Sequence, residues 1–132
     1  MSHLLTSTIQ IKDIEALRSA ATALGGQLEQ SKVFTSYTGD NNPCEYRIKL
    51  PGARYQVGVQ KQKEGYLLSH DPYSYGSQHD GHKLKAAFGT ALIKLQQQYA
   101  KHATMNAARK QGWFCREKKL ENGGIQLQLV RA

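Results

Sequence analysis

The side chains best suited to chemistry or binding gather in one polar segment, residues 70–83. Its fourteen residues hold three of the five histidines, two of the seven tyrosines and two aspartates. Imidazole and carboxylate groups can move protons or ligate metals, and tyrosine rings can stack on bases. Because the segment has no apolar periodicity, we expect a recognition loop, whereas a plain linker would be rich in Gly, Ser and Pro.

A metal or catalytic role is the first possibility for this loop. His79, Asp80 and His82, together with His70 and Asp71, could approach zinc or manganese, and Asp80 could orient a histidine that acts as a general base. The chain has no HExxH spacing, GxSxG elbow or activated cysteine motif to hold such groups in place. We therefore expect no metal site, no cofactor and no catalytic residues.

Phosphate binding is the second possibility. The chain has neither GxxxxGK[ST] nor GxGxxG, which excludes a Walker or Rossmann loop. Ser74 and Ser77 precede a predicted helix whose first turn carries Lys83 and Lys85. A cation in the first turn interacts unfavourably with the helix dipole and destabilises the helix by roughly 0.3 to 1 kcal/mol, unless an anion binds there. This pattern indicates an anionic ligand, with a solvated helix start as the alternative.

Aromatic and basic side chains supply two more candidate contacts. Tyr73 and Tyr75 would point the same way in an extended backbone and could stack on a nucleobase, or could instead pack onto the sheet. Two predicted strands carry a charged face made of Arg47, Lys49 and Arg54. This face could contact an anionic ligand, or it could be the ordinary solvated face of an antiparallel sheet. The candidate ligand-binding residues are therefore Tyr73, Ser74, Tyr75, Ser77, His79, His82, Lys83, Lys85, Arg47, Lys49 and Arg54.

The charge balance points to anionic partners. Eighteen Lys and Arg against ten Asp and Glu give a net charge of +8, and the excess builds toward the C-terminus. A positive field concentrates polyanions and phosphorylated small molecules near the surface. A nucleic-acid-binding alternative would use the basic residues Lys101, Arg109, Lys110, Arg116, Lys118 and Lys119.

The elements that must position these groups follow from local patterns. Asp13 is a predicted N-cap, apolar residues then recur at helical spacing, and Gly25-Gly26 predicts the helix end. From Lys83 the helical period returns in a long helix that Gly112 ends, and Asn122-Gly123 predicts a hairpin. Strands are predicted at residues 8–11, 28–38, 46–50, 54–60, 66–68, 113–120 and 125–131, with a turn at residues 39–43.

This order predicts a single α+β domain over residues 1–132. We expect a largely antiparallel sheet, in the order β-α-β-β-β-β-α-β-β, with one short and one long helix packed on one face. The two cysteines lack CxxC spacing, which excludes a zinc ribbon or dithiol site. No apolar run is long enough to span a membrane and the first residues do not resemble a signal peptide, so we expect a cytoplasmic protein that does not bind membranes.

Several short motifs follow one another along the chain. They are Met1-Ser2-His3, Ile9-x-Ile11-x-Asp13-x-x-x-Leu17, Tyr37-x-Gly39, Gln98-Tyr99-Ala100, Gln111-Gly112-Trp113-Phe114 and Gly123-Gly124-Ile125-Gln126-Leu127-x-Leu129-Val130-Arg131. In this order they resemble the hypothetical chloroplast reading frame 35 family, whose members occur in algal plastids, cyanobacteria, other bacteria and bacteriophages. The resemblance supports the fold but implies no reaction, cofactor or catalytic residue.

The sequence thus favours a non-catalytic binding protein for a phosphate-bearing, nucleotide-like ligand. We expect it to form a homo-oligomer and, if it is phage-encoded, to act in the host cytoplasm as a sponge for a nucleotide signal. The alternatives are an RNA- or DNA-binding accessory protein and a protein-interaction subunit.

Overall fold

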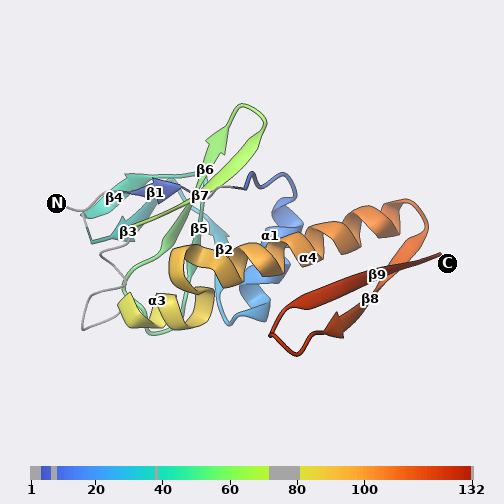
Figure 1. Ribbon diagram of the computed structural model, residues 1–132. Coiled ribbons are helices and arrows are strands. Elements are labelled where there is room, and N and C mark those ends of the chain that lie inside the picture. The colour runs from blue at the N-terminus through green and yellow to red at the C-terminus, as the bar shows by residue number, and fades with distance from the viewer. Residues whose placement is uncertain (1–3, 7–8, 38, 72–80, 132) are drawn as a thin grey trace.

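In the computed structural model, which describes residues 4–6, 9–37, 39–71 and 81–131, a five-stranded antiparallel sheet forms the centre of the molecule (Figure 1). Two further strand pairs form separate small sheets. The strands are β1 (Leu5–Thr6), β2 (Gln27–Gln30), β3 (Val33–Ser36), β4 (Gly39–Pro43), β5 (Tyr46–Lys49), β6 (Val57–Gln62), β7 (Gly65–His70), β8 (Trp113–Lys119) and β9 (Ile125–Arg131). The large sheet has the order β1-β7-β6-β5-β2, while β3 pairs with β4 and β8 pairs with β9.

Helices cover one face of the large sheet. They are α1 (Ile14–Ala23), α3 (Gly81–Phe88), the 3-10 turn η1 (Thr90–Leu92) and α4 (Ile93–Lys110). Leu17 of α1 and Leu95 of α4 are fully buried in one core with Val59 and Leu68 of the sheet. The predicted α+β class, antiparallel sheet and helix placement are therefore confirmed. No helix among the described residues is long and apolar enough to cross a membrane.

The start of α1 confirms the predicted cap. Asp13 has an extended backbone, and its Oδ1 accepts a hydrogen bond from Ala16 N at 3.0 Å. Its Oδ2 accepts one from Asn106 Nδ2 of α4 at 3.2 Å, so the cap also joins the two helices. The hydrogen bond from Ala16 is the main reason why the pKa of Asp13 lies below its ordinary value.

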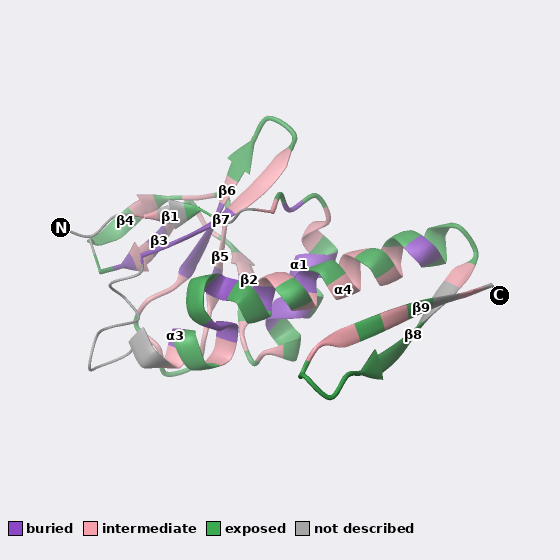
Figure 2. Cartoon of the chain, in the orientation of Figure 1, coloured by how far each residue is buried: buried purple, intermediate pink, exposed green. Residues whose placement is uncertain are grey.

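The first half of the central strand β6, residues 57–59, is buried, whereas the end of the strand is exposed, as Figure 2 shows by colour. Val57 and Val59 face the helices, while Gly58 lies beneath the ring of Phe34. A Cβ built on Gly58 would lie 2.2 Å from Phe34 Cε1, so only glycine admits this ring. The small β3–β4 sheet thereby closes the second face of the large sheet.

The long helix predicted from Lys83 onward is bent. Gly89 has φ +83°, and Ala91 and Leu92 also have positive φ values of 55° and 61°, which turns the chain between α3 and α4. Leu92 is fully buried, whereas Ala91 beside it is exposed. A glycine beside two residues in the left-handed region accounts for the kink.

The segment at residues 28–38, predicted as one strand, is divided between two sheets. The predicted turn at residues 39–43 is the strand β4, which pairs with β3. The Asn42 side chain stabilises this pair, because Nδ2 donates to Phe34 O at 3.0 Å and to Gly39 O at 2.9 Å. A turn-forming residue here supports a strand through its side chain.

Candidate functional site

The structure places only the ends of the polar segment at residues 70–83. His82 lies in the first turn of α3, and Lys83 follows it. Lys85 lies in the last turn of this short helix, where a cation suits the dipole, so the predicted first-turn mismatch does not apply to it. Tyr73, Ser74, Tyr75, Ser77 and His79 lie outside the described residues.

The first two residues of the segment belong to the sheet and not to an exposed loop. His70 ends β7, pairs with Leu5 and is 4% exposed, while Asp71 is 1% exposed. Burial lowers the pKa of His70, and the Asp71 carboxylate opposes this shift only in part. Both residues are therefore built into the fold at the point where the segment leaves it.

Burial of histidine makes stability depend on pH. His70 and, through burial and the nearby Lys101, His102 both have pKa values lowered from 6.5. The unfolded chain then binds more protons than the folded one as the pH falls below about 6.5, so stability decreases on acidification. We expect the melting temperature to fall between about pH 7.5 and pH 5.5. The variant His70→Asn should show a smaller fall, and an unchanged pH dependence would contradict this role of His70.

Lys83 connects α3 to the segment between β5 and β6, residues 50–56, which we call the β5–β6 connection. Lys83 Nζ donates to Gly52 O at 2.7 Å. The connection begins with a tight turn in which Ala53 N donates to Leu50 O at 3.0 Å and Gly52 has φ +77°. Pro51 and Gly52 suit the two central positions of such a turn. The turn thus presents a carbonyl to the lysine ammonium.

The same connection carries an aromatic and cationic cluster at the surface. Arg54 Cζ lies 5.8 Å from the centroid of the Tyr55 ring. The ring of Tyr37, which follows β3, lies 6.5 Å from that of Tyr55 and is tilted by 60°. Gln56 fixes this arrangement, because its N donates to Thr35 O at 2.9 Å and its Oε1 accepts from Thr35 N at 3.0 Å. We call Tyr37, Arg54 and Tyr55 the Tyr–Arg cluster.

A hollow of about 500 Å³ adjoins the start of the connection. Lys49 lines it together with Leu50, Pro51 and Ala53 of the connection and the residues that follow α1. Of the predicted site residues, Arg54 lies in the connection, Lys49 directly precedes it, and Lys83 reaches it from α3, a distant part of the chain.

Arg47 and Lys49 are paired with an acidic residue. Arg47 Nε lies 2.5 Å from Glu29 Oε1, and Lys49 Nζ lies 3.2 Å from Glu29 Oε2. The hydrogen bond from Arg47 is the main cause of the lowered pKa of Glu29. Arg47 also donates to Val33 O at 3.4 Å, so it joins β5 to β3. Its charge is used mainly within the fold, whereas the Lys49 side chain remains 42% exposed.

Sequence reasoning missed two members of the Tyr–Arg cluster. The sequence predicts Tyr55 within a strand, but β6 begins only at Val57 and leaves Tyr55 half-buried in the connection. Tyr37 is 58% exposed and received no role from the sequence. The adjacent pair Arg54-Tyr55 was the available signal, since its cation–aromatic contact is local. The partner Tyr37 lies too far along the chain for any spacing rule.

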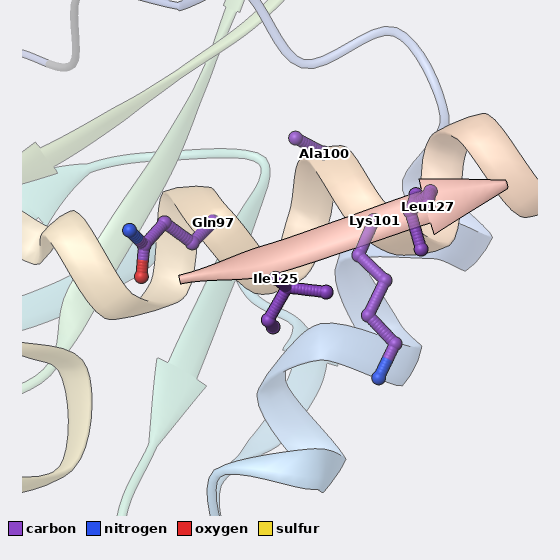
Figure 3. Close-up of a pocket in the computed structure, with 5 residues that line it drawn as sticks. All are labelled: Gln97, Ala100, Lys101, Ile125 and Leu127. Atoms are coloured by element: carbon purple, nitrogen blue, oxygen red, sulfur yellow. The ribbon is translucent and has the colours of Figure 1, made fainter. Parts of the chain in front are cut away.

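A second hollow, of about 240 Å³, lies between α4 and strand β9 and is lined by residues of both (Figure 3). Its walls are mainly apolar, with Ala100 on the helix and Ile125 and Leu127 on the strand. Lys101 at its side forms an ion pair with Glu117 of β8 at 2.7 Å. Lys101 is therefore neutralised within the fold.

The β5–β6 connection offers the better chemistry for an anionic ligand. Exposed tyrosine rings bind planar groups, and a guanidinium with nearby ammonium groups binds phosphate.

Within residues 4–6, 9–37, 39–71 and 81–131, no three His, Cys, Asp or Glu side chains are grouped so that they could hold a metal ion.

Comparison with known proteins gives the family of the chain. Residues 20–129 match the family described as "Protein of unknown function (DUF1257)", and because the match spans most of the sequence the chain belongs to this family. Neither a curated protein nor a solved structure matches the chain.

Proposed function

We propose that this protein is a non-catalytic binding protein that captures a phosphate-bearing, nucleotide-like ligand at the β5–β6 connection. The single observation that carries the proposal is the Tyr–Arg cluster, a pair of tyrosine rings of which Tyr37 is exposed and the half-buried Tyr55 lies against the Arg54 guanidinium. A nucleotide has the matching parts, a planar base and an anionic phosphate.

The base would stack on Tyr37, whose ring is more than half exposed. Stacking on an aromatic side chain contributes roughly 1 to 3 kcal/mol per base. The phosphate would then lie toward Arg54, whose planar guanidinium can donate two parallel hydrogen bonds to it. Lys83 adds positive charge at the turn that precedes Arg54, and Lys49, which is paired with Glu29, lines the hollow beside it.

The remaining candidate residues would complete this site. Tyr73, Ser74, Tyr75, Ser77, His79 and His82 precede Lys83 in the chain, and Lys83 contacts the connection. Chain continuity therefore supports their inclusion. Lys85, which is exposed on α3, would add positive charge. Arg47 would not contact the ligand directly, because it is paired with Glu29, which also binds Lys49.

Calorimetry with a panel of nucleoside mono-, di- and triphosphates tests the proposal. Arg54→Ala and Tyr37→Ala should each weaken the affinity for the best nucleotide about tenfold, because each removes a contact of roughly 1 to 3 kcal/mol. Arg116→Ala, which removes an exposed arginine from the hairpin β8–β9, is the matched control and should have little effect. The proposal fails if no nucleotide binds, or if the control weakens binding as much.

Finer parts of the proposal rest on the sequence. They are kinship with the hypothetical chloroplast reading frame 35 proteins, a cytoplasmic location, and assembly into a homo-oligomer. A phage-encoded member would act as a sponge for a nucleotide signal of the host. Native mass spectrometry of the purified protein would report the bound ligand and the number of chains together.

A further inference from the structure

The hairpin β8–β9 has two different faces, because successive residues of a strand point to opposite sides. Glu117, Ile125 and Leu127 lie on the face toward α4, as the Lys101–Glu117 ion pair and the hollow of Figure 3 show. Arg116 pairs with Gln128, and Lys118 pairs with Gln126, on the opposite face. All four of these side chains are exposed.

This outward face carries positive charge without compensation. Among the described residues of the hairpin, the acidic side chains are Glu117, which bonds to Lys101 on the inner face, and Glu121, which lies in the turn. Arg109, exposed in the last turn of α4, adds another cation just before β8. The part of this face nearer the hairpin turn therefore presents cations and amides together.

We propose that the outward face of β8–β9 binds double-stranded DNA, with the two-stranded ribbon in the major groove. The charge of the face is complementary to the phosphate backbone, whose neutralisation supplies most non-specific affinity. The four exposed side chains are those that read base edges, since arginine and lysine donate to guanine and glutamine pairs with adenine.

The dimensions of the ribbon fit this partner. Two strands lie about 4.8 Å apart, and the major groove of DNA, about 12 Å wide, admits such a ribbon. Successive outward residues on one strand lie about 6.8 Å apart, which is close to two base-pair steps of about 3.4 Å each. The major groove of an RNA duplex is too deep and narrow for side chains to read, so the same face discriminates against it.

Fluorescence anisotropy of a labelled DNA duplex, titrated with the full chain at several salt concentrations, tests this inference. Binding should weaken steeply between about 50 and 200 mM salt. The double variant Arg116→Ala with Lys118→Ala should weaken it at least about tenfold, because it removes both of the cations that read base edges. Lys119→Ala, which removes the neighbouring cation from the other face of the strand, is the matched control and should change binding far less.

Other results would overturn the inference. These are no binding of the duplex at low salt, an equal loss with Lys119→Ala, or equal affinity for an RNA duplex or a single strand of the same sequence. An unchanged melting temperature shows that the double variant is folded. Because Arg54→Ala leaves this face intact, it should not alter DNA binding, so failure here is distinguishable from failure of the nucleotide site.

Discussion

Replacing Gly58 with alanine is expected to lower the free energy of unfolding by about 3 kcal/mol. The added methyl group would lie 2.2 to 2.7 Å from three atoms of the Phe34 ring, closer than any real contact. Both residues are buried, and Gly58 lies in the central strand, so neither the ring nor the backbone can move away at low cost. Urea denaturation followed by far-ultraviolet circular dichroism measures this loss.

A double-mutant cycle separates the clash from an effect of strand propensity. Phe34→Ala alone should cost about 3 to 5 kcal/mol through the cavity that it leaves. In the double variant Gly58→Ala with Phe34→Ala, the methyl group enters that cavity, so the combined cost should be smaller than the sum. Strict additivity of the two changes would contradict the packing of Phe34 on Gly58.

Tyr99→Phe is expected to lower the free energy of unfolding by about 2 kcal/mol. The Tyr99 hydroxyl accepts hydrogen bonds from Lys12 N at 2.9 Å and Asp13 N at 3.2 Å, and its side chain is 7% exposed. Phenylalanine keeps the ring but leaves two partly buried N–H groups without this acceptor, and such losses cost about 1 to 3 kcal/mol each where water cannot replace them. A hollow lined by Lys12, Asp13 and Tyr99 lets some water enter, which keeps the expected cost near the lower end.

Tyr46→Phe is the matched control for this prediction. Tyr46 packs edge-on against Tyr66, with ring centroids 5.8 Å apart, and its hydroxyl has no hydrogen-bond partner among the described residues. Its loss should change stability by less than about 0.5 kcal/mol. Hydrogen exchange of the Lys12 and Asp13 amides should accelerate only in Tyr99→Phe. If Tyr46→Phe lowered the stability as much as Tyr99→Phe, the proposed contribution of the Tyr99 hydroxyl would be contradicted.

Tyr99 illustrates why the sequence pointed to the right element but not to its role. Its helical spacing predicted a core position, and the structure buries it. The hydroxyl contacts lie 86 and 87 residues away in the chain, so no local pattern could reveal them. The same holds for Asn106, whose amide reaches the cap residue Asp13.

In the candidate site, too, the sequence identified some of the residues but not their contacts. The basic residues Lys49, Arg54 and Lys83 were identified from their charge and neighbourhood, and the structure brings them to one connection. Charge alone could not show that Arg47 is paired with Glu29 on the adjacent strand. Composition also suggested that His70 was exposed, but its place at the end of a paired strand buries it.

The sequence by itself determined the features that depend on a few neighbouring residues. These are the cap at Asp13, the helix end at Gly25, the hairpin turn at Asn122-Gly123 and the α+β class that follows from their order. Each rests on hydrogen bonds or dihedral preferences within about four residues, which a linear pattern records.

Only the tertiary structure decided which surfaces are available for binding. The pairing of Tyr37 with Tyr55, the cover of Phe34 over Gly58, and the choice of the outward face of β8–β9 all depend on contacts between distant strands and helices. Such contacts arise from packing and burial of the whole chain, so the same tyrosine or lysine can lie in the core, in an ion pair or at a surface. The fold, and not the residue type, therefore selects the residues that can meet a ligand.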